Sequence, residues 1–354
     1  MSRFLNAEYE SLVPYTPGEQ PKVAGRLIKL NTNENPYPPA PGVCKIINDD
    51  ELNKLKLYSD PEASMLNEAI AENFGLKKSQ VITGNGSDEI LAFIFMAFKG
   101  KTGKVYYPEI SYSFYPVYCD VFGAQSVQVP LREDFSVNPE DYYDAEGTIV
   151  ITNPNAPTGI ALTLDQIEDI LIHNKDNLVV IDEAYVDFGA ESAVQLIGRY
   201  DNLLVVQTFS KSRSLAGARI GYALGNDEII ADLNTIKFSF NPYNLDRLAI
   251  LAGTEAMKDN EYFNNTRREI MATREQFVES MKDMGFRILP SKANFVFAAS
   301  DDISGQDFFT KLREENIIVR HFKNDKISNF VRITIGTPEE MSLLVEATKK
   351  ILNK

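Results

Sequence analysis

Cysteine, histidine and long hydrophobic runs are all scarce in this sequence of 354 residues. Its two cysteines, Cys44 and Cys119, cannot build a disulfide framework and indicate a reducing compartment. The longest apolar run, residues 90–98, is too short to cross a bilayer, and residues 1–8 contain no apolar signal core. We therefore expect a cytoplasmic protein.

Positive charge is also in short supply, with 36 lysines and arginines against 50 acidic residues and a formal net charge of −14. Nucleic acids and anionic membranes both reward clustered basic residues, so we expect neither as a partner. An anionic small-molecule ligand would need positive charge gathered at one place against this overall field. No metal site is indicated.

Apolar runs of strand length alternate with helix-length stretches through most of the chain. Residues 178–181 are apolar throughout, which is typical of strands buried on both faces of a parallel sheet. Residues 203–208 and 220–224 are joined by too short a segment for a helical crossover, so one strand there is expected to be antiparallel. The pattern predicts an α/β fold with a mostly parallel seven-stranded sheet. The expected strands are residues 80–83, 104–107, 125–129, 148–152, 178–181, 203–208 and 220–224.

The pattern changes after about residue 260. A long helical stretch, residues 261–284, leads to separated short strands at residues 294–298 and 329–335, and a last helix begins at Pro338. This pattern predicts a smaller α+β domain. We expect a large domain of residues 30–260, and a second part made of an N-terminal arm, residues 1–29, and the smaller domain, residues 261–354.

Lys211 lies just beyond an expected strand, between Ser210 and a Gly/Ala-rich stretch that contains Arg219. A lysine amine forms a Schiff base with an aldehyde, and pyridoxal 5'-phosphate carries both an aldehyde and a phosphate. Ser210 and Arg219 suit the phosphate. Taken alone, a surface lysine near an arginine is the simpler interpretation, but four further segments favour the cofactor.

The first of these segments, residues 84–89, follows an expected strand and opens an apolar helix. Gly84 and Gly86 let a ligand approach the backbone, and the free N–H groups at a helix start can hold a phosphate. A dinucleotide-binding motif is weakly indicated, because Glu89 stands where a third glycine is needed. The alternative is a plain turn in which Asp88 and Glu89 match the helix dipole.

Three more segments follow expected strands. Asp182 ends a buried run, where an acid can keep a pyridine nitrogen protonated, and Tyr185 is placed to reach the ring's phenolic oxygen; a helix cap is the alternative for Asp182. Residues 153–159, with two prolines and a glycine, form a rigid loop in which the Ala156–Pro157 bond is a candidate for the cis form. Tyr112 is placed to stack on a flat ring, although a lone tyrosine is more often part of the core.

Together these segments resemble fold-type-I PLP enzymes and, within them, the histidinol-phosphate aminotransferase family. The likeness covers nearly the whole chain, and the order and spacing of the segments carry it rather than any single one. The matching segments are residues 14–18, 30–37, 58–61, 84–89, 153–159, 182–185, 208–219 and 331–336.

The resemblance implies a role for each matching residue around the cofactor. It places Lys211 at the imine, Asp182 at the pyridine nitrogen and Tyr185 at the phenolic oxygen. Family members with two consecutive asparagines before Pro-Thr-Gly use the second asparagine at that oxygen. In this sequence the second position is Ala156, so either Asn155 substitutes or Tyr185 acts alone. The remaining implied cofactor contacts are Gly86, Ser87, Asp88, Ser210 and Arg219 for the phosphate and Tyr112 for stacking.

The catalytic base can be argued without the resemblance. A base must move a proton at the substrate's α-carbon, and the only two histidines, His173 and His321, lie at a polar helix end and beside Arg320. Lys211, once displaced by the substrate amine, is the natural base. The amino group then passes through the cofactor to a keto acid, which predicts ping-pong kinetics.

The expected substrate contacts are arginines at strand ends. Arg332 lies on the opposite face of its strand from Val331 and Ile333, where its guanidinium can grip a carboxylate with two prongs. Arg320 with Tyr15 resembles the family's substrate-phosphate contacts, with a surface ion pair as the alternative for Arg320. The resemblance also assigns Asn35 to the substrate. Since histidinol phosphate has no carboxylate, Arg332 is implied to serve glutamate and 2-oxoglutarate.

The most favoured activity is the interconversion of histidinol phosphate with 2-oxoglutarate and imidazole-acetol phosphate with glutamate. Threonine-phosphate decarboxylase shares most of these motifs, and a broader aromatic aminotransferase is a third possibility. A non-catalytic PLP-binding regulator is the alternative from another class, and the intact Lys211 argues against it. In the family, Tyr58 reaches across a two-fold interface to the partner's PLP phosphate, so the resemblance also implies a homodimer.

Overall fold

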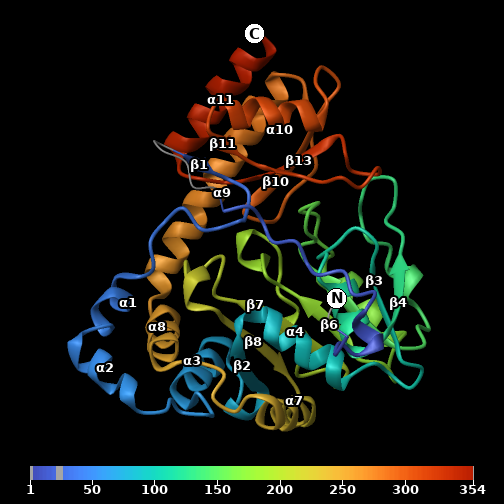
Figure 1. Cartoon of the computed structure of the whole chain (residues 1–354), viewed down its shortest axis with the longest axis vertical. Helices are drawn as coiled ribbons and strands as arrows, with labels where there is room; N and C mark the ends of the chain where they lie inside the picture. The colour runs from blue at the N-terminus through green and yellow to red at the C-terminus, as the bar shows by residue number, and fades with distance from the viewer. Residues whose placement is uncertain (1–2, 21–26, 354) are drawn as a thin grey trace.

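A computed structural model describes residues 3–20 and 27–353 of the chain. A seven-stranded sheet covered by helices forms the larger part of the molecule, and a four-stranded antiparallel sheet with its own helices forms the smaller part above it (Figure 1). The N-terminal segment crosses between the two parts. No helix in the described ranges is long and apolar enough to cross a membrane.

The large sheet has the strand order β2-β8-β7-β6-β5-β3-β4. Strand β8 runs antiparallel to both of its neighbours, β2 and β7, which confirms the expected antiparallel strand in the 203–224 region. Every residue of β5, β7 and β8 is buried, as their apolar sequences predict. The strands are β2 (Val81–Asn85), β3 (Lys104–Pro108), β4 (Gln125–Val129), β5 (Thr148–Thr152), β6 (Val179–Asp182), β7 (Leu203–Thr208) and β8 (Ile220–Gly225).

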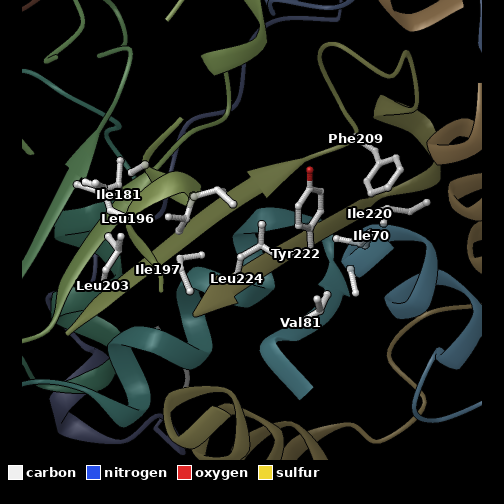
Figure 2. Packing of buried hydrophobic residues seen from close by; sticks show 14 of the residues in the cluster. Ile70, Val81, Ile181, Leu196, Ile197, Leu203, Phe209, Ile220, Tyr222 and Leu224 are labelled. Atoms are coloured by element: carbon white, nitrogen blue, oxygen red, sulfur yellow. The ribbon is translucent and has the colours of Figure 1, made fainter. Parts of the chain in front are cut away.

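Helices cover both faces of this sheet and bury its apolar side chains. Figure 2 shows part of the core on one face, where Ile70 from α3 lies near Val81, Ile220 and Tyr222 of the sheet. On the other face, α4, α5 and α7 pack against the sheet through a second cluster of buried residues. The helices of the large part are α1 (Pro41–Ile46), α2 (Asp49–Asn53), α3 (Ser64–Phe74), α4 (Gly86–Ala97), α5 (Tyr115–Phe122), α6 (Leu164–Ile172), α7 (Asp227–Phe240) and α8 (Arg247–Lys258).

The smaller part is joined to the larger by α9 (Asn260–Asp283), whose first turns pack on the large core and whose later turns pack on the small one (Figure 1). The expected division at residue 260 thus falls at the first residue of this helix. The small antiparallel sheet has the order β12-β13-β10-β9, and β1 pairs in parallel with β11. The elements of the smaller part are β1 (Ile28–Lys29), β9 (Phe286–Ile288), β10 (Phe295–Ser300), α10 (Gly305–Glu314), β11 (Ile317–Ile318), β12 (Arg320–His321), β13 (Phe330–Thr334) and α11 (Pro338–Leu352).

The end of β2 differs from the expected one. The strand was expected to stop at Thr83, but it continues to Asn85, and α4 begins at once with Gly86. The reason is the neighbouring strand, since Gly221 of β8 lies opposite Gly84 and lets the helix start sit against it. A Cβ atom on Gly221 would lie 2.1 Å from the backbone nitrogen of Ser87. The start of α4 is therefore fixed directly on the sheet.

Candidate active site

A cavity of about 350 Å³ lies where the parallel strands end, and the N-terminal segment and the small part contribute to its wall. Thr152, Asp182 and Thr208, the last residues of β5, β6 and β7, all line it, as expected for ligand sites in such sheets. The structure brings eleven of the predicted site residues into this one wall: Tyr15, Ser87, Asp88, Tyr112, Asp182, Tyr185, Ser210, Lys211, Arg219, Arg320 and Arg332.

Lys211 lines the cavity with an amine that has no carboxylate partner in the described chain. Its Nζ atom donates to the carbonyl oxygen of Thr32 at 3.0 Å. Removal from water lowers the pKa of Lys211 to about 8, and the positive charge of Arg332 adds to this effect, while Glu34 opposes it. Near pH 8 a large fraction of the molecules therefore has a neutral Lys211 amine. The neutral amine is the form that attacks a carbonyl carbon or accepts a proton.

Asp182 is buried at the base of the cavity. The hydroxyl of Tyr115 donates to its Oδ2 at 2.7 Å, and its Oδ1 has no partner among the described residues. Burial raises the pKa of Asp182 to about 6, although the bond from Tyr115 opposes this. A buried, unpaired carboxylate oxygen is costly unless a ligand donates a proton to it.

The start of α4 and the turn after β7 form a cradle for an anion. The Nη2 of Arg219 lies 2.7 Å from Oδ2 of Asp88, and its Nη1 lies 3.4 Å from the hydroxyl of Ser210. Arg219 has a left-handed backbone conformation, and a Cβ atom on Gly86 would lie 2.4 Å from its Nη2. Gly86 has a positive φ of 78°, which strains any other residue, and a side chain there would also displace the guanidinium of Arg219. The N–H of Gly86 donates to the carbonyl oxygen of Arg219 at 2.8 Å, whereas the N–H groups that follow it in the first turn of α4 have no acceptor within the helix and suit a phosphate.

Aromatic rings close one side of the cavity. The hydroxyl of Tyr112 donates to Oδ1 of Asp88 at 2.8 Å, which fixes its ring, and the ring stands edge-on to that of Tyr115. Tyr15, from the N-terminal segment, packs against Tyr112 and Phe114 with ring centroids 6.1 and 4.7 Å away. Burial raises the pKa of Tyr15, and the charges of Arg320 and Arg332, which line the same cavity, oppose this.

Arg320 and Arg332 lie directly opposite each other on the antiparallel strands β12 and β13. Like charges at such a position repel each other, so the pair favours a bound anion. Arg332 donates from Nη2 to the carbonyl of Asn31 at 2.9 Å, and its buried Nε has no partner in the part of the chain that the structure describes. Burial lowers the pKa of Arg332, Tyr185 opposes this change, and Arg320 adds to it.

Four predicted site residues lie outside the cavity wall. Asn155 is buried behind it and donates to the carbonyl of Ile110 at 2.9 Å and to Thr158 at 3.1 Å. Asn35 donates to the backbone carbonyl oxygens of Lys211 and Ser212, so it holds the lysine's backbone. Gly86 makes room for Arg219, and Tyr58 is 83% exposed on the surface. The Ala156–Pro157 bond is cis, as is Asn153–Pro154.

Sequence reasoning missed residues that support the predicted ones. Asn33 donates from Nδ2 to the hydroxyl of Tyr185 at 3.1 Å, which leaves the tyrosine's own proton free to donate. Asn33 has a positive φ of 55°, a conformation in which asparagine is enriched, but a sequence does not display φ. Tyr115, the first residue of α5, holds Asp182, although no motif in the sequence singles it out. His173 and His321 bond the carbonyl oxygens of Asp169 and Ser328, and neither is part of the cavity wall.

The model of the aminotransferase class I and II family matches residues 26–347, so the chain belongs to this family. The histidinol-phosphate aminotransferase of Brachyspira hyodysenteriae is 52% identical over 353 residues, which cover 99% of each chain. Within the family, the chain belongs to the histidinol-phosphate aminotransferases.

Solved structures agree with this assignment in fold. The histidinol-phosphate aminotransferase of Clostridium acetobutylicum has a TM-score of 0.85 and 27% identity, covering 92% of this chain and 99% of that one. The enzyme of Sinorhizobium meliloti, solved in complex with pyridoxal 5'-phosphate, has a TM-score of 0.84 and 24% identity, covering 92% of this chain and 91% of that one. The fold is that of the fold-type-I PLP aminotransferases.

The chain is thus a pyridoxal-phosphate-dependent transferase, and its cavity fits that cofactor. The unpaired Oδ1 of Asp182 suits a protonated ring nitrogen. The start of α4 with Arg219 and Ser210 suits the phosphate, and the amine of Lys211 suits the aldehyde.

Proposed function

We propose that this enzyme interconverts L-histidinol phosphate plus 2-oxoglutarate and imidazole-acetol phosphate plus L-glutamate. The observation that carries the proposal is the pairing of Arg320 with Arg332 on the wall shared with Lys211. Two opposed guanidinium groups beside the phenol of Tyr15 suit a dianionic phosphate, and each substrate of the pair carries a phosphate or a second carboxylate. The names of the relatives at about half identity support the same reaction.

We assign the cofactor contacts to the cavity residues described above. When bound, pyridoxal 5'-phosphate supplies a ring that withdraws electrons from the substrate's α-carbon. The carboxylate of Asp182 would accept a hydrogen bond from the ring nitrogen and keep it protonated, and Tyr185 would donate to the phenolic oxygen. We leave Asn155 out of this set because its amide hydrogens are directed to Ile110 and Thr158. The phosphate would lie against Arg219, Ser210 and the backbone of Ser87 and Asp88, with Tyr112 over the ring.

Lys211 would act as the base that moves the proton at the substrate's α-carbon. Its lowered pKa keeps a useful fraction of the amine neutral at the pH of the cell. Asn35 and the carbonyl of Thr32 hold the lysine's backbone and amine, so the base is oriented before the substrate binds. Nearby Tyr15 and the two arginines would fix the substrate's anionic group, which sets the α-carbon over the lysine.

We also propose that the enzyme works as a symmetric dimer in the cytoplasm. Tyr58 is too exposed to serve a site in its own chain, and a ring on the surface of one subunit can complete the cavity of another. We propose in addition that each subunit has two domains. Residues 30–260 form the large cofactor-binding domain, and residues 1–29 and 261–354 form the N-terminal arm and the small domain.

The test is to offer the purified, PLP-loaded protein a set of amino donors with 2-oxoglutarate and to measure glutamate. Histidinol phosphate should be the best donor, and Lys211→Ala should serve as the inactive control. Release of carbon dioxide from L-threonine phosphate without transfer from histidinol phosphate would favour the decarboxylase. Equal use of tyrosine, phenylalanine and histidinol phosphate would favour the broader aromatic aminotransferase.

A further inference from the structure

Lys237, near the end of α7, is a buried cation that forms no salt bridge with any carboxylate of the described residues. It is 1% exposed, and its Nζ donates to one neutral group, the carbonyl oxygen of Pro61, at 2.8 Å. Burial lowers the pKa of Lys237, and the more distant carboxylates of Glu89, Asp60 and Glu62 oppose this. Its ammonium also lies 5.4 Å from the centroid of the Phe238 ring. Fully buried lysines are rare and costly, so a lysine whose hydrogen bond goes to a loop carbonyl needs an explanation.

The carbonyl that Lys237 binds belongs to a short segment, residues 58–63, which is anchored at two points. Beside the bond from Lys237 to Pro61, the hydroxyl of Ser59 donates to the carbonyl of Leu245 at 2.6 Å. Between the anchors, the carboxylate of Asp60 accepts from the backbone N–H groups of residues 62 and 64 and closes a turn. The segment is thus held rigidly against α7 and the loop that follows it.

Tyr58 stands at the exposed end of this anchored segment. Its ring stacks on that of Tyr243 with centroids 4.7 Å apart, although the two side chains are 83% and 46% exposed. Leu55, Leu57 and Phe240 are also exposed nearby in sequence, so apolar side chains gather along these two segments. Exposed apolar groups of this kind mark a protein interface.

We propose that Lys237 is a positioning residue for the cofactor site of the partner subunit. Its ammonium fixes Pro61, and the fixed segment holds Tyr58 in the direction that reaches the partner's cofactor phosphate. This inference rests on the proposed dimer in which Tyr58 crosses the interface. The same loop also touches its own chain's site, since Asn244 donates to Glu89 at 2.6 Å and Glu89 accepts from the backbone of Asn85 before α4. The experiment must therefore separate an effect of Lys237 on the partner's cofactor site from an effect on the site of its own chain.

The first measurement is the dissociation constant of PLP from the apoprotein, followed by absorbance. Lys237→Met keeps an unbranched apolar side chain of similar size and removes the ammonium, so it should raise this constant roughly tenfold, as Tyr58→Phe should. In the double variant Tyr58→Phe/Lys237→Met the constant should equal that of Tyr58→Phe alone, because Lys237 acts through Tyr58.

Lys99→Met is the matched control, since Lys99 also donates to a single backbone carbonyl, that of Phe122, at 2.8 Å. It should leave the constant unchanged. Should Lys237→Met fail to fold, Ser59→Ala removes the other anchor and carries the same expectation. Fully additive effects in the double variant, or an unchanged constant in Lys237→Met, would overturn the proposal. An unchanged constant in Tyr58→Phe would overturn it together with the assembly, while the measured reaction would stand.

The second measurement uses dimers that contain one Lys211→Ala subunit and one Lys237→Met subunit, isolated through two different tags. If Lys237 serves the partner's site, one site of the hybrid receives both changes and the other receives neither. The hybrid should then bind one PLP with wild-type affinity and show about half of the wild-type activity. If Lys237 serves its own chain's site, neither site is intact, and no tight site will be found.

Discussion

Tyr115 donates a hydrogen bond of 2.7 Å to Oδ2 of Asp182 and leaves Oδ1 of the same carboxylate without a partner in the described chain. The tyrosine is itself fully buried and also lies 2.8 Å from the hydroxyl of Thr152. The carboxylate is therefore oriented by one oxygen and available through the other. This is the arrangement that a protonated ring nitrogen requires.

Asp182→Asn should change the pH dependence of the apoprotein's stability. Because burial raises the pKa of Asp182 to about 6, the folded state favours the protonated acid, and ionisation costs stability as the pH rises from about 4 to 6. Above pH 6 the ionised Asp182 lowers the free energy of unfolding by at most about 3 kcal/mol. The asparagine of the variant does not ionise, so the variant does not lose this stability. Thermal unfolding of both apoproteins should show that the stability of the variant relative to the wild type increases between pH 4 and pH 8. A difference that is the same at both pH values would contradict the assignment.

Lys211→Ala should abolish the covalent attachment of the cofactor but not its binding. In the wild type, borohydride should fix PLP to the peptide that contains Lys211, which mass spectrometry can identify. The variant should still hold PLP through Arg219 and Ser210, while its turnover falls by several orders of magnitude, since base and attachment are lost together. Turnover near the wild-type rate would show that another residue is the base.

The two arginines should be separable by substrate. Arg332→Lys replaces a two-pronged donor by a point charge and should mainly raise KM for glutamate and 2-oxoglutarate. Arg320→Ala should mainly weaken the binding of histidinol phosphate, by about 1.5–3 kcal/mol for the loss of a charge-assisted contact. Steady-state kinetics of both half-reactions provide the comparison. Equal losses for both substrates in each variant would mean that the pair acts as one undivided anion site.

Tyr58→Ala and Lys211→Ala should complement each other in a mixed dimer. Each variant alone should be impaired, Tyr58→Ala through weaker PLP binding and Lys211→Ala through chemistry. After co-refolding, one site carries both changes and the other carries none, so activity should reappear. If hybrids demonstrably form and remain inactive, Tyr58 does not contribute to the partner's site.

The sheet and the residues at its strand ends were predictable because burial leaves a strong signal in sequence. Residues 148–152 and 203–208 are apolar runs, and β5 and β7 have these same bounds. Asp182 ends such a run and Lys211 follows one, so their meeting at one edge follows from the parallel topology. Arg219 comes immediately before β8, whose antiparallel direction places its start at the same edge. The family and its fold were correctly recognised from the same segments.

Other parts of the site left no such signal. Strands β1 and β11 have two residues each and exist only because segments nearly 290 positions apart lie side by side, as Ile28 and Ile317 do. Asn33 reaches Tyr185 through a left-handed backbone, and Tyr115 reaches Asp182 across two elements. The amide nitrogens of Asn35 and Asn155 donate to groups outside the cavity wall, and only the folded backbone determines which side an asparagine serves.

The pairing of β1 with β11 also sets an order of events during synthesis. The seven strands of the large sheet lie between residues 81 and 225, so they can pair while the chain is still being made. Tyr15 and Asn33 are made first, but their partners Arg320, Arg332 and Thr334 emerge from the ribosome among the last residues. A nascent chain thus holds a phosphate cradle long before it holds a substrate pocket, and a chain that stops before residue 317 lacks both the strand that receives β1 and the two arginines.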